Sequence, residues 1–159
     1  MYEFAVLFVC RGNTCRSPMA EAIFKQLLVD KGVSEEWKVC SAGTNARVGN
    51  PPSDKSRQVM ESYGVEHHIK HHRSRKLSVC DFDDFNFILC MDNSNLKDAQ
   101  RLSPSSYVAE LRLLGSHSDF NQCAIVKNPF RGSLNDYNTA YIQCLHFCGT
   151  FLDYIYTQP

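Results

Sequence analysis

Residues 4–18 read F-A-V-L-F-V-C-R-G-N-T-C-R-S-P, an apolar run that passes through a glycine-containing turn to a proline. The six apolar residues at 4–9 suit a strand that is buried on both faces of a parallel sheet. Arg11-Gly12-Asn13 then marks a turn. Because Ser17 is a good N-cap and Pro18 suits a first helical position, a helix is predicted from Pro18. This strand-turn-helix unit indicates the start of an α/β fold.

The rest of the chain alternates strand and helix patterns. Apolar residues recur at helical spacing after Pro18 until Lys31-Gly32 ends the pattern. Further strands are predicted at 37–42, 85–91 and 109–114, and further helices at 53–63 and about 140–155. The alternation predicts one small doubly wound α/β domain over residues 1–159, with helices on both faces of a parallel sheet. The functional crevice is expected at the carboxyl ends of the strands, bordered by the loops at 43–53 and 115–133.

The composition excludes several classes of protein. Seventeen Lys and Arg residues balance seventeen Asp and Glu residues, so the chain as a whole is not an electrostatic nucleic-acid binder. The N-terminal apolar run has only six residues, which is too short for a signal-peptide core or a membrane span. We therefore expect a cytoplasmic monomer that binds neither nucleic acid nor membranes.

The eight cysteines are expected to be reduced thiols, because a disulfide scaffold needs a secreted and usually shorter chain. Cys10 and Cys15 lack the C-x-x-C spacing of a structural zinc site, and the histidine-rich run at 66–76 completes no plausible ligand set. No metal or other cofactor is predicted. Five cysteines are interpreted as small buried hydrophobic residues: Cys40, Cys80, Cys123, Cys144 and Cys148.

Cys10 and Arg16 are separated by five residues within the turn after the first strand. A short loop that leads into a helix can aim successive backbone N–H groups at one tetrahedral anion. Arg16 offers a planar fork of donors for two phosphate oxygens, and Cys10 among these donors is predicted to be a thiolate that attacks phosphorus. The nucleotide-binding pattern G-x-x-x-x-G-K-[ST] does not occur, which disfavours nucleoside triphosphates. The predicted phosphate-binding residues are Arg11, Gly12, Asn13, Thr14, Cys15 and Arg16.

The stretch V-C-R-G-N-T-C-R-S-P-M-A-E at 9–21 resembles the signature of low-molecular-weight protein tyrosine phosphatases. The resemblance implies a four-stranded parallel sheet flanked by helices, with Cys10 as the nucleophile and Arg16 as the phosphate-gripping residue. It also implies a cofactor-free phosphatase that binds phosphate-like anions and acts on phosphotyrosine proteins or aryl phosphates. The resemblance continues through Ser41-Ala42-Gly43-Thr44, Gly49-Asn50-Pro51-Pro52, His72-x-x-Arg75 and the segment 89–96.

The same resemblance implies roles around the loop. The Ser17 hydroxyl is implied to hydrogen-bond the Cys10 sulfur and to favour its thiolate form. His72 is implied to join a hydrogen-bond network beneath the loop. Cys15 is implied to capture oxidised Cys10 as a reversible disulfide. Four residues in all are implied to support the loop: Asn13, Ser17, His72 and Asp92.

The chain departs from the family pattern before the last helix. The family carries Asp-Pro there, and this aspartate is the general acid that protonates the leaving tyrosine oxygen, but here the stretch is Lys127-Asn128-Pro129-Phe130-Arg131. An asparagine at position 128 has no acidic proton to give. A phenol has a pKa of about 10, and general acid catalysis is typically worth about 10² to 10⁴ in rate. Phosphotyrosine turnover is therefore predicted to be slow, with Asp136 interpreted as a solvated residue at the start of the last helix.

The mouth of the predicted site is unusually basic. Phe130 remains from the aromatic walls usual in the family, whereas Arg131 and Arg47 stand where aromatic residues are common. Together with Arg11, these arginines predict a preference for phosphopeptides with acidic flanks.

Two other functions stay open at this point. One is a phosphotyrosine-binding module or substrate trap with little turnover, since the loop is intact and the acid is absent. The other is arsenate reduction, with Cys80 and Cys90 as further thiols, which is disfavoured because nothing indicates that these thiols are exposed and reactive.

Overall fold

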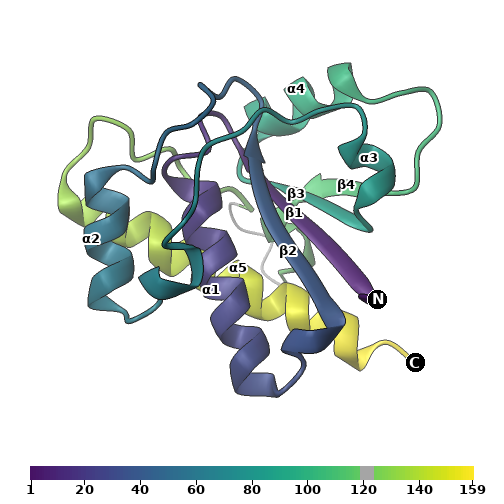
Figure 1. Cartoon of the computed structure of the whole chain (residues 1–159), viewed down its shortest axis with the longest axis horizontal. Coiled ribbons are helices and arrows are strands. Elements are labelled where there is room, and N and C mark those ends of the chain that lie inside the picture. The colour runs from purple at the N-terminus through teal and green to yellow at the C-terminus, as the bar shows by residue number, and fades with distance from the viewer. Residues whose placement is uncertain (119–123) are drawn as a thin grey trace.

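The computed structural model describes residues 1–118 and 124–159, so Cys123 lies outside the described residues. Four strands form one sheet in the order β2-β1-β3-β4, and all three neighbouring pairs are parallel. The predicted four-stranded parallel sheet is confirmed (Figure 1). The strands are β1 (Phe4–Cys10), β2 (Trp37–Gly43), β3 (Phe87–Cys90) and β4 (Glu110–Leu113).

Helices connect the strands and cover the sheet (Figure 1). The α-helices are α1 (Arg16–Lys31), α2 (Asp54–Ser62), α3 (Asp81–Asp84), α4 (Asn93–Leu102) and α5 (Leu134–Thr157). Short 3₁₀ turns are η1 (Ser34–Glu36), η2 (Glu66–Ile69) and η3 (Leu114–His117). Within the described parts of the chain, no helix is long and apolar enough to cross a membrane.

The central strand β1 explains why helices occupy both faces. Successive side chains of a strand point to opposite faces of its sheet. Val6 and Phe8 are buried in the cluster that contains the apolar residues of α1 and α5, whereas Leu7 and Val9 are buried in a second cluster with residues of α3 and α4. A continuous apolar run is therefore required at 4–9, and the prediction of helices on both faces is confirmed.

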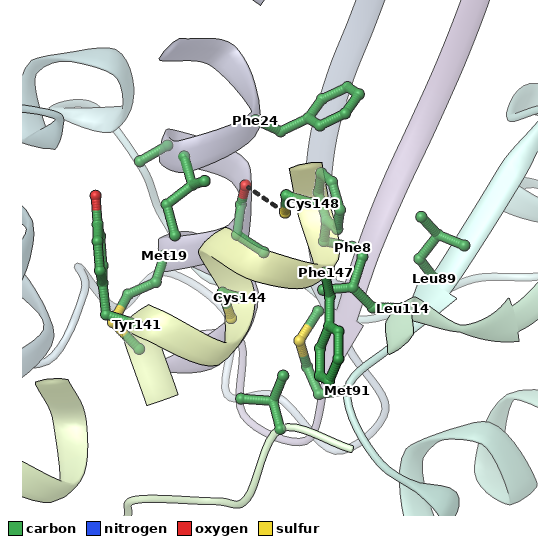
Figure 2. Packing of buried hydrophobic residues seen from close by; sticks show 14 of the residues in the cluster. Phe8, Met19, Phe24, Leu89, Met91, Leu114, Tyr141, Cys144, Phe147 and Cys148 are labelled. Carbon is green, nitrogen blue, oxygen red and sulfur yellow. Dashed lines mark hydrogen bonds between the residues drawn. The ribbon is translucent and has the colours of Figure 1, made fainter. Parts of the chain in front are cut away.

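The larger cluster is packed by aromatic and sulfur-containing side chains (Figure 2). Cys144 and Cys148 of α5 lie in it with no exposed surface, as predicted for small hydrophobic residues. Burial raises the pKa of the Cys144 thiol to about 12, and the pKa of Cys148 is raised for the same reason. These thiols are inert packing groups.

The interpretation of Cys80 as a buried residue is wrong. Cys80 is exposed and Cys40 is half-buried. Cys80 directly precedes the one-turn helix α3 on the surface, where its neighbour Phe82 supplies the buried contact instead. The seven described cysteines are free thiols in this structure.

Helix α1 begins two residues earlier than predicted. Its N-cap is Cys15, which makes no capping hydrogen bond through its side chain, and Arg16 is the first helical residue. Ser17 as the N-cap and Pro18 as the first helical residue are therefore wrong. The Ser17 hydroxyl contacts the Cys10 sulfur instead. Pro18 is tolerated inside the first turn because the first four N–H groups of a helix have no partner within it.

Candidate active site

A cavity of about 460 Å³ opens where β1 passes into α1. It lies at the carboxyl end of β1, the edge where the sheet topology predicts it. No Asp or Glu is among the described residues that line it. The lining residues are Cys10, Arg11, Gly12, Thr14, Cys15, Arg16, Asn45, Arg47, Asn50, Asn128 and Phe130.

Cys10 lies at the base of this cavity, at the last position of β1, and its side chain is only 2% exposed. The backbone N–H of Asn13 donates to its Sγ at 3.2 Å, and the Ser17 hydroxyl lies 3.0 Å from the same sulfur. Hydrogen bonds of this kind favour a charged acceptor over a neutral one. Cys10 Sγ is held at the base of the cavity by these two polar contacts.

Asn13 holds the loop from beneath. It is completely buried, and its backbone has a φ of 57°, in the left-handed region that asparagine tolerates better than most residues. Its Oδ1 accepts from the backbone N–H of Arg75 at 3.0 Å, and the Nε2 of His72 donates to its carbonyl oxygen at 2.8 Å. Asn13 and His72 thus contact each other beside the loop, and their supporting role stays a prediction. Asn13 does not line the cavity, although the sequence reading also placed it among the phosphate ligands.

A chain of hydrogen bonds orients the Ser17 hydroxyl. Ser41 donates to the Glu21 carboxylate at 2.7 Å, so its oxygen accepts from Asn13 Nδ2 at 3.0 Å. The same Nδ2 donates to Ser17 Oγ at 2.9 Å. The Ser17 hydrogen is then free for Cys10 Sγ, because its other possible acceptor, the Ala42 carbonyl, lies farther away at 3.5 Å. Cys10 Sγ is thus linked through these side chains to the buried carboxylate of Glu21, which pairs with Lys25 at 2.8 Å.

Arg16 is fixed at one end and open at the other. Its Nη1 donates to Asp92 Oδ2 at 2.6 Å and to the carbonyl oxygen of Val126 at 2.9 Å, and the side chain is 2% exposed. Asp92 is itself held as the N-cap of α4, where its Oδ1 accepts from Asn95 N at 2.9 Å. No other protein partner of the guanidinium occurs among residues 1–118 and 124–159, so Nε and Nη2 remain available for an anion in the cavity.

Cys15 shares the cavity wall with Cys10. Its Sγ lies 3.3 Å from Ser53 Oγ and donates to the Tyr137 hydroxyl oxygen at 3.7 Å. Burial, with the hydrogen bond to Cys15 second, raises the pKa of Tyr137 to about 12. Tyr137 is therefore a neutral phenol at physiological pH.

Asn128 reaches the cavity on a separate loop that begins at Val126. The backbone N–H of Val126 donates to the carbonyl oxygen of Met91 at 2.8 Å, which anchors the loop to the end of β3. Asn128 Oδ1 accepts from the backbone N–H of Phe130 at 3.1 Å. This bond occupies the amide oxygen and leaves the amide nitrogen, which carries no acidic proton.

Together with Arg11 of the loop, two of the three predicted rim residues reach the cavity. Arg11, Arg47 and Phe130 line it. Arg131 does not, because its guanidinium lies 5.3 Å from the centroid of the Phe130 ring and its side chain lines a neighbouring hollow. Four residues of the site were not predicted from the sequence: Glu21, Ser41, Asn45 and Asn50. All except Asn45 lie within the family motifs quoted above.

Asp136 lies at the start of α5 rather than in the wall of the cavity. It forms a capping box with Ser133 at the start of α5, where its Oδ2 accepts from Ser133 N at 2.8 Å. These hydrogen bonds from Ser133 lower the pKa of the Asp136 carboxyl below its ordinary value, so it is ionised at neutral pH. It is absent from the lining of the cavity around Cys10.

The capping box makes a prediction about stability. Replacing Asp136 by Asn lowers the denaturant midpoint at neutral pH, because the folded-state pKa of this carboxyl is depressed and its stabilisation is present above the unfolded value. The difference between the two proteins closes as the pH falls below the ordinary pKa of 3.8 and through the folded value. Urea unfolding of both proteins at pH 7 and at decreasing pH measures it. A difference that persists in acid contradicts the assignment.

Comparison with known proteins agrees with this geometry. The family model for low molecular weight phosphotyrosine protein phosphatases matches residues 5–157. The human enzyme of that name is 41% identical over 152 residues, or 94% of each chain, and the Schizosaccharomyces pombe enzyme is 39% identical over 92% of this chain and 94% of its own. The crystal structure of DARP, a Drosophila arginine phosphatase, has a TM-score of 0.88 at 37% identity and covers 97% of this chain and 99% of its own. The chain belongs to the low-molecular-weight protein tyrosine phosphatase family.

Proposed function

We propose that this protein hydrolyses phosphotyrosine through a phosphocysteine intermediate, with slow departure of the tyrosine because position 128 carries no acid. The observation that supports the proposal is the meeting of Cys10, the open end of Arg16 and Asn128 in one cavity. Turnover in this family rests on a cysteine nucleophile, and the hydrogen bonds to Cys10 Sγ suit that role.

In the first step the phosphate lies between the loop N–H groups and Arg16, and Cys10 Sγ attacks phosphorus. The new S–P bond forms as the bond from phosphorus to the tyrosine oxygen breaks. The departing phenolate takes its proton from water, since no Asp or Glu of residues 1–118 and 124–159 lines the cavity. In the second step water attacks phosphorus, the S–P bond breaks, and inorganic phosphate and the Cys10 thiolate are released.

A second role, as a phosphotyrosine-binding module, is supported by the same residue. Asn128 removes the acid and leaves the anion-binding parts of the cavity in place, so bound phosphoproteins are released intact if the first step is slower than dissociation. The two roles differ only in the rate of phosphoryl transfer to Cys10 relative to dissociation, and the experiment below measures that rate.

Phosphoarginine is the substrate named for DARP, and it serves as a comparison substrate here. Its leaving group is a guanidine, whose nitrogen takes up a proton as the P–N bond breaks, so that the product is a guanidinium cation. The cavity presents Arg11 and Arg47 at its mouth and no lining carboxylate among the described residues. Like charges disfavour that leaving group, so phosphotyrosine is the substrate we propose.

Cys15 is proposed as the partner of oxidised Cys10. Peroxide converts the Cys10 thiolate to a sulfenic acid, and the Cys15 thiol then displaces water to form a disulfide. Both thiols lie in the wall of one cavity, which supports this proposal. Thiol reductants reverse it.

The test of function is a rapid-mixing experiment with an activated aryl phosphate and with phosphotyrosine. Because the activated phenol departs without protonation, a burst of phenol equal to the enzyme concentration is expected, followed by slower turnover. Phosphotyrosine shows a much slower first step. Acid quenching captures the phosphocysteine on Cys10, and the Cys10→Ser variant captures none.

Other results of this experiment would support the binding module or contradict the proposal. Tight binding of phosphotyrosine peptides with no burst from either substrate supports the binding module. Faster hydrolysis of phosphoarginine than of phosphotyrosine contradicts the proposed substrate. Absence of both binding and burst contradicts the phosphate site itself.

A further inference from the structure

A second hollow, of about 550 Å³, adjoins the catalytic cavity. The two share Arg11 and Asn45 as lining residues, so they are continuous along the surface at this point. The hollow lies between the carboxyl end of β2 and helix α4, which are adjacent in the upper part of Figure 1. The residues that give it its character are Arg11, Lys76, Asp98, Arg101, Leu77 and Leu102.

The charge of this hollow is positive. It holds three cations against one carboxylate, and that carboxylate is engaged, because Asp98 accepts from Arg101 Nη1 at 2.9 Å and from the Thr44 hydroxyl at 3.4 Å. Arg11 and Lys76 form no salt bridge with any carboxylate of residues 1–118 and 124–159. Arg11 and Lys76 therefore face solvent without a counter-charge from the described part of the chain.

These cations are carried by an ordered backbone. Lys76 forms a parallel β-bridge with Gly43, and hydrogen bonds of 2.9 Å on either side of it join Gly43 N to Arg75 O and Leu77 N to Gly43 O. Gly43 is needed for this close approach, since a Cβ there would lie 2.5 Å from the Arg11 carbonyl oxygen. Arg101 extends from the last turn of α4. The backbone positions of these cations are therefore set before a ligand binds, which limits the entropy lost on binding to that of their side chains.

We propose that this hollow is a subsite for an acidic side chain of the phosphorylated substrate, an Asp or Glu a few residues away from the phosphotyrosine. The proposal rests on the phosphotyrosine function above, and it extends the basic rim from the cavity mouth to Lys76 and Arg101. Arg11 borders both hollows, so it faces the phosphate on one side and the acidic side chain on the other. Leu77 and Leu102 provide apolar contact for the methylene groups of a glutamate.

The experiment measures the binding of two fluorescent phosphotyrosine peptides that differ only in glutamate or glutamine at the flanking positions. All proteins carry Cys10→Ser so that turnover does not interfere. The variants are Lys76→Glu, Arg101→Glu and their combination, since neither residue lines the catalytic cavity. The control is Lys70→Glu, which makes the same change of charge as either single variant at an exposed residue that lines neither hollow.

The combined variant is expected to bind the glutamate peptide about tenfold more weakly at low salt, because each exposed charge pair contributes only modestly. Binding of the glutamine peptide changes little, and Lys70→Glu affects neither peptide. The loss of affinity of the combined variant for the glutamate peptide shrinks at about 1 M salt as charges are screened. Equal losses for both peptides, or no loss for the glutamate peptide, refute the subsite.

A second assay tests the proposed phosphatase activity independently of the subsite. With Cys10 restored, hydrolysis of an activated aryl phosphate too small to reach the hollow is expected to be the same in the native protein and the combined variant. Absence of that hydrolysis in the native protein refutes the proposed catalysis, whereas the peptide-binding comparison still decides the subsite.

Discussion

Replacing Asn128 by Asp is expected to raise the rate of phosphotyrosine hydrolysis by about 10² to 10⁴, the usual contribution of a general acid. The tyrosine oxygen is a poor leaving group when unprotonated, since phenols have a pKa of about 10. The native side chain at this position lines the cavity and has no acidic proton.

The local geometry already suits the carboxyl group. Asn128 Oδ1 accepts from Phe130 N at 3.1 Å, and an aspartate keeps this bond with one oxygen while the other carries the proton. The exchange conserves size, so the loop needs no rearrangement. The variant also acquires a new pH dependence: its phosphotyrosine rate falls as the pH rises and the new carboxylic acid loses its proton, whereas the native protein has no such decline from this residue.

The measurement compares single-turnover rates for phosphotyrosine and for an activated aryl phosphate. Asn50→Asp is the matched control, because it places the same group in the wall of the same cavity on a different loop. The expected gain is large for phosphotyrosine, small for the activated substrate, and absent in the control. A gain of similar size for both substrates would show that the aspartate acts on something other than the leaving group.

Replacing Arg16 by Lys is expected to lower the rate of the phosphoryl-transfer step by about 10² to 10³, the typical effect of removing a donor aimed at transition-state charge. A lysine keeps the positive charge but loses the planar fork. Arg16 uses Nη1 for Asp92 and for the Val126 carbonyl, and its remaining nitrogens for the cavity. A single ammonium group cannot occupy both places.

The same substitution is expected to lower stability by about 2 to 3 kcal/mol, since one of two charge-assisted hydrogen bonds is lost around a largely buried pair. Urea unfolding measures this loss in the free energy of unfolding. Arg57→Lys, in the exposed pair with Asp54, is the control, and its free energy of unfolding is expected to change little. Binding of inorganic phosphate separates affinity from chemistry. An Arg16→Lys protein with native stability and native rates would contradict the role assigned to this guanidinium.

Local patterns predicted the frame of the fold well. The apolar run before Cys10 could only be satisfied by burial on both faces, and that requirement fixes a central parallel strand with helices above and below. Helix α4 was missed, although Leu96, Ala99 and Leu102 recur along it at helical spacing. The sequence signal for this helix was Asp92-x-x-Asn95, a capping box at its N-terminus. In the structure the side chain of each residue accepts from the backbone N–H of the other.

The interior of the site was less accessible to prediction. The partners of Asn13 lie 28 and 62 residues away, at Ser41 and Arg75, and no local pattern reports such pairings. The N-cap was misread for the same reason: the Ser17 hydroxyl serves the sulfur seven residues earlier rather than its own helix end. Arg131 looked equivalent to Arg47 in sequence, but stacking on Phe130 turns it away from the cavity.

The hydrogen bonds of Arg16 have a consequence for folding kinetics. One links Arg16 to Asp92, 76 positions along the chain, and the other links it to Val126, 110 positions along. The parts of the site therefore meet only after strands from most of the chain have associated. Contacts of such long sequence separation slow folding and form late. Recovery of phosphate binding after dilution from denaturant should therefore follow the final cooperative folding phase, and a nascent chain that ends before Val126 lacks a finished site however well its first strand and helix have formed.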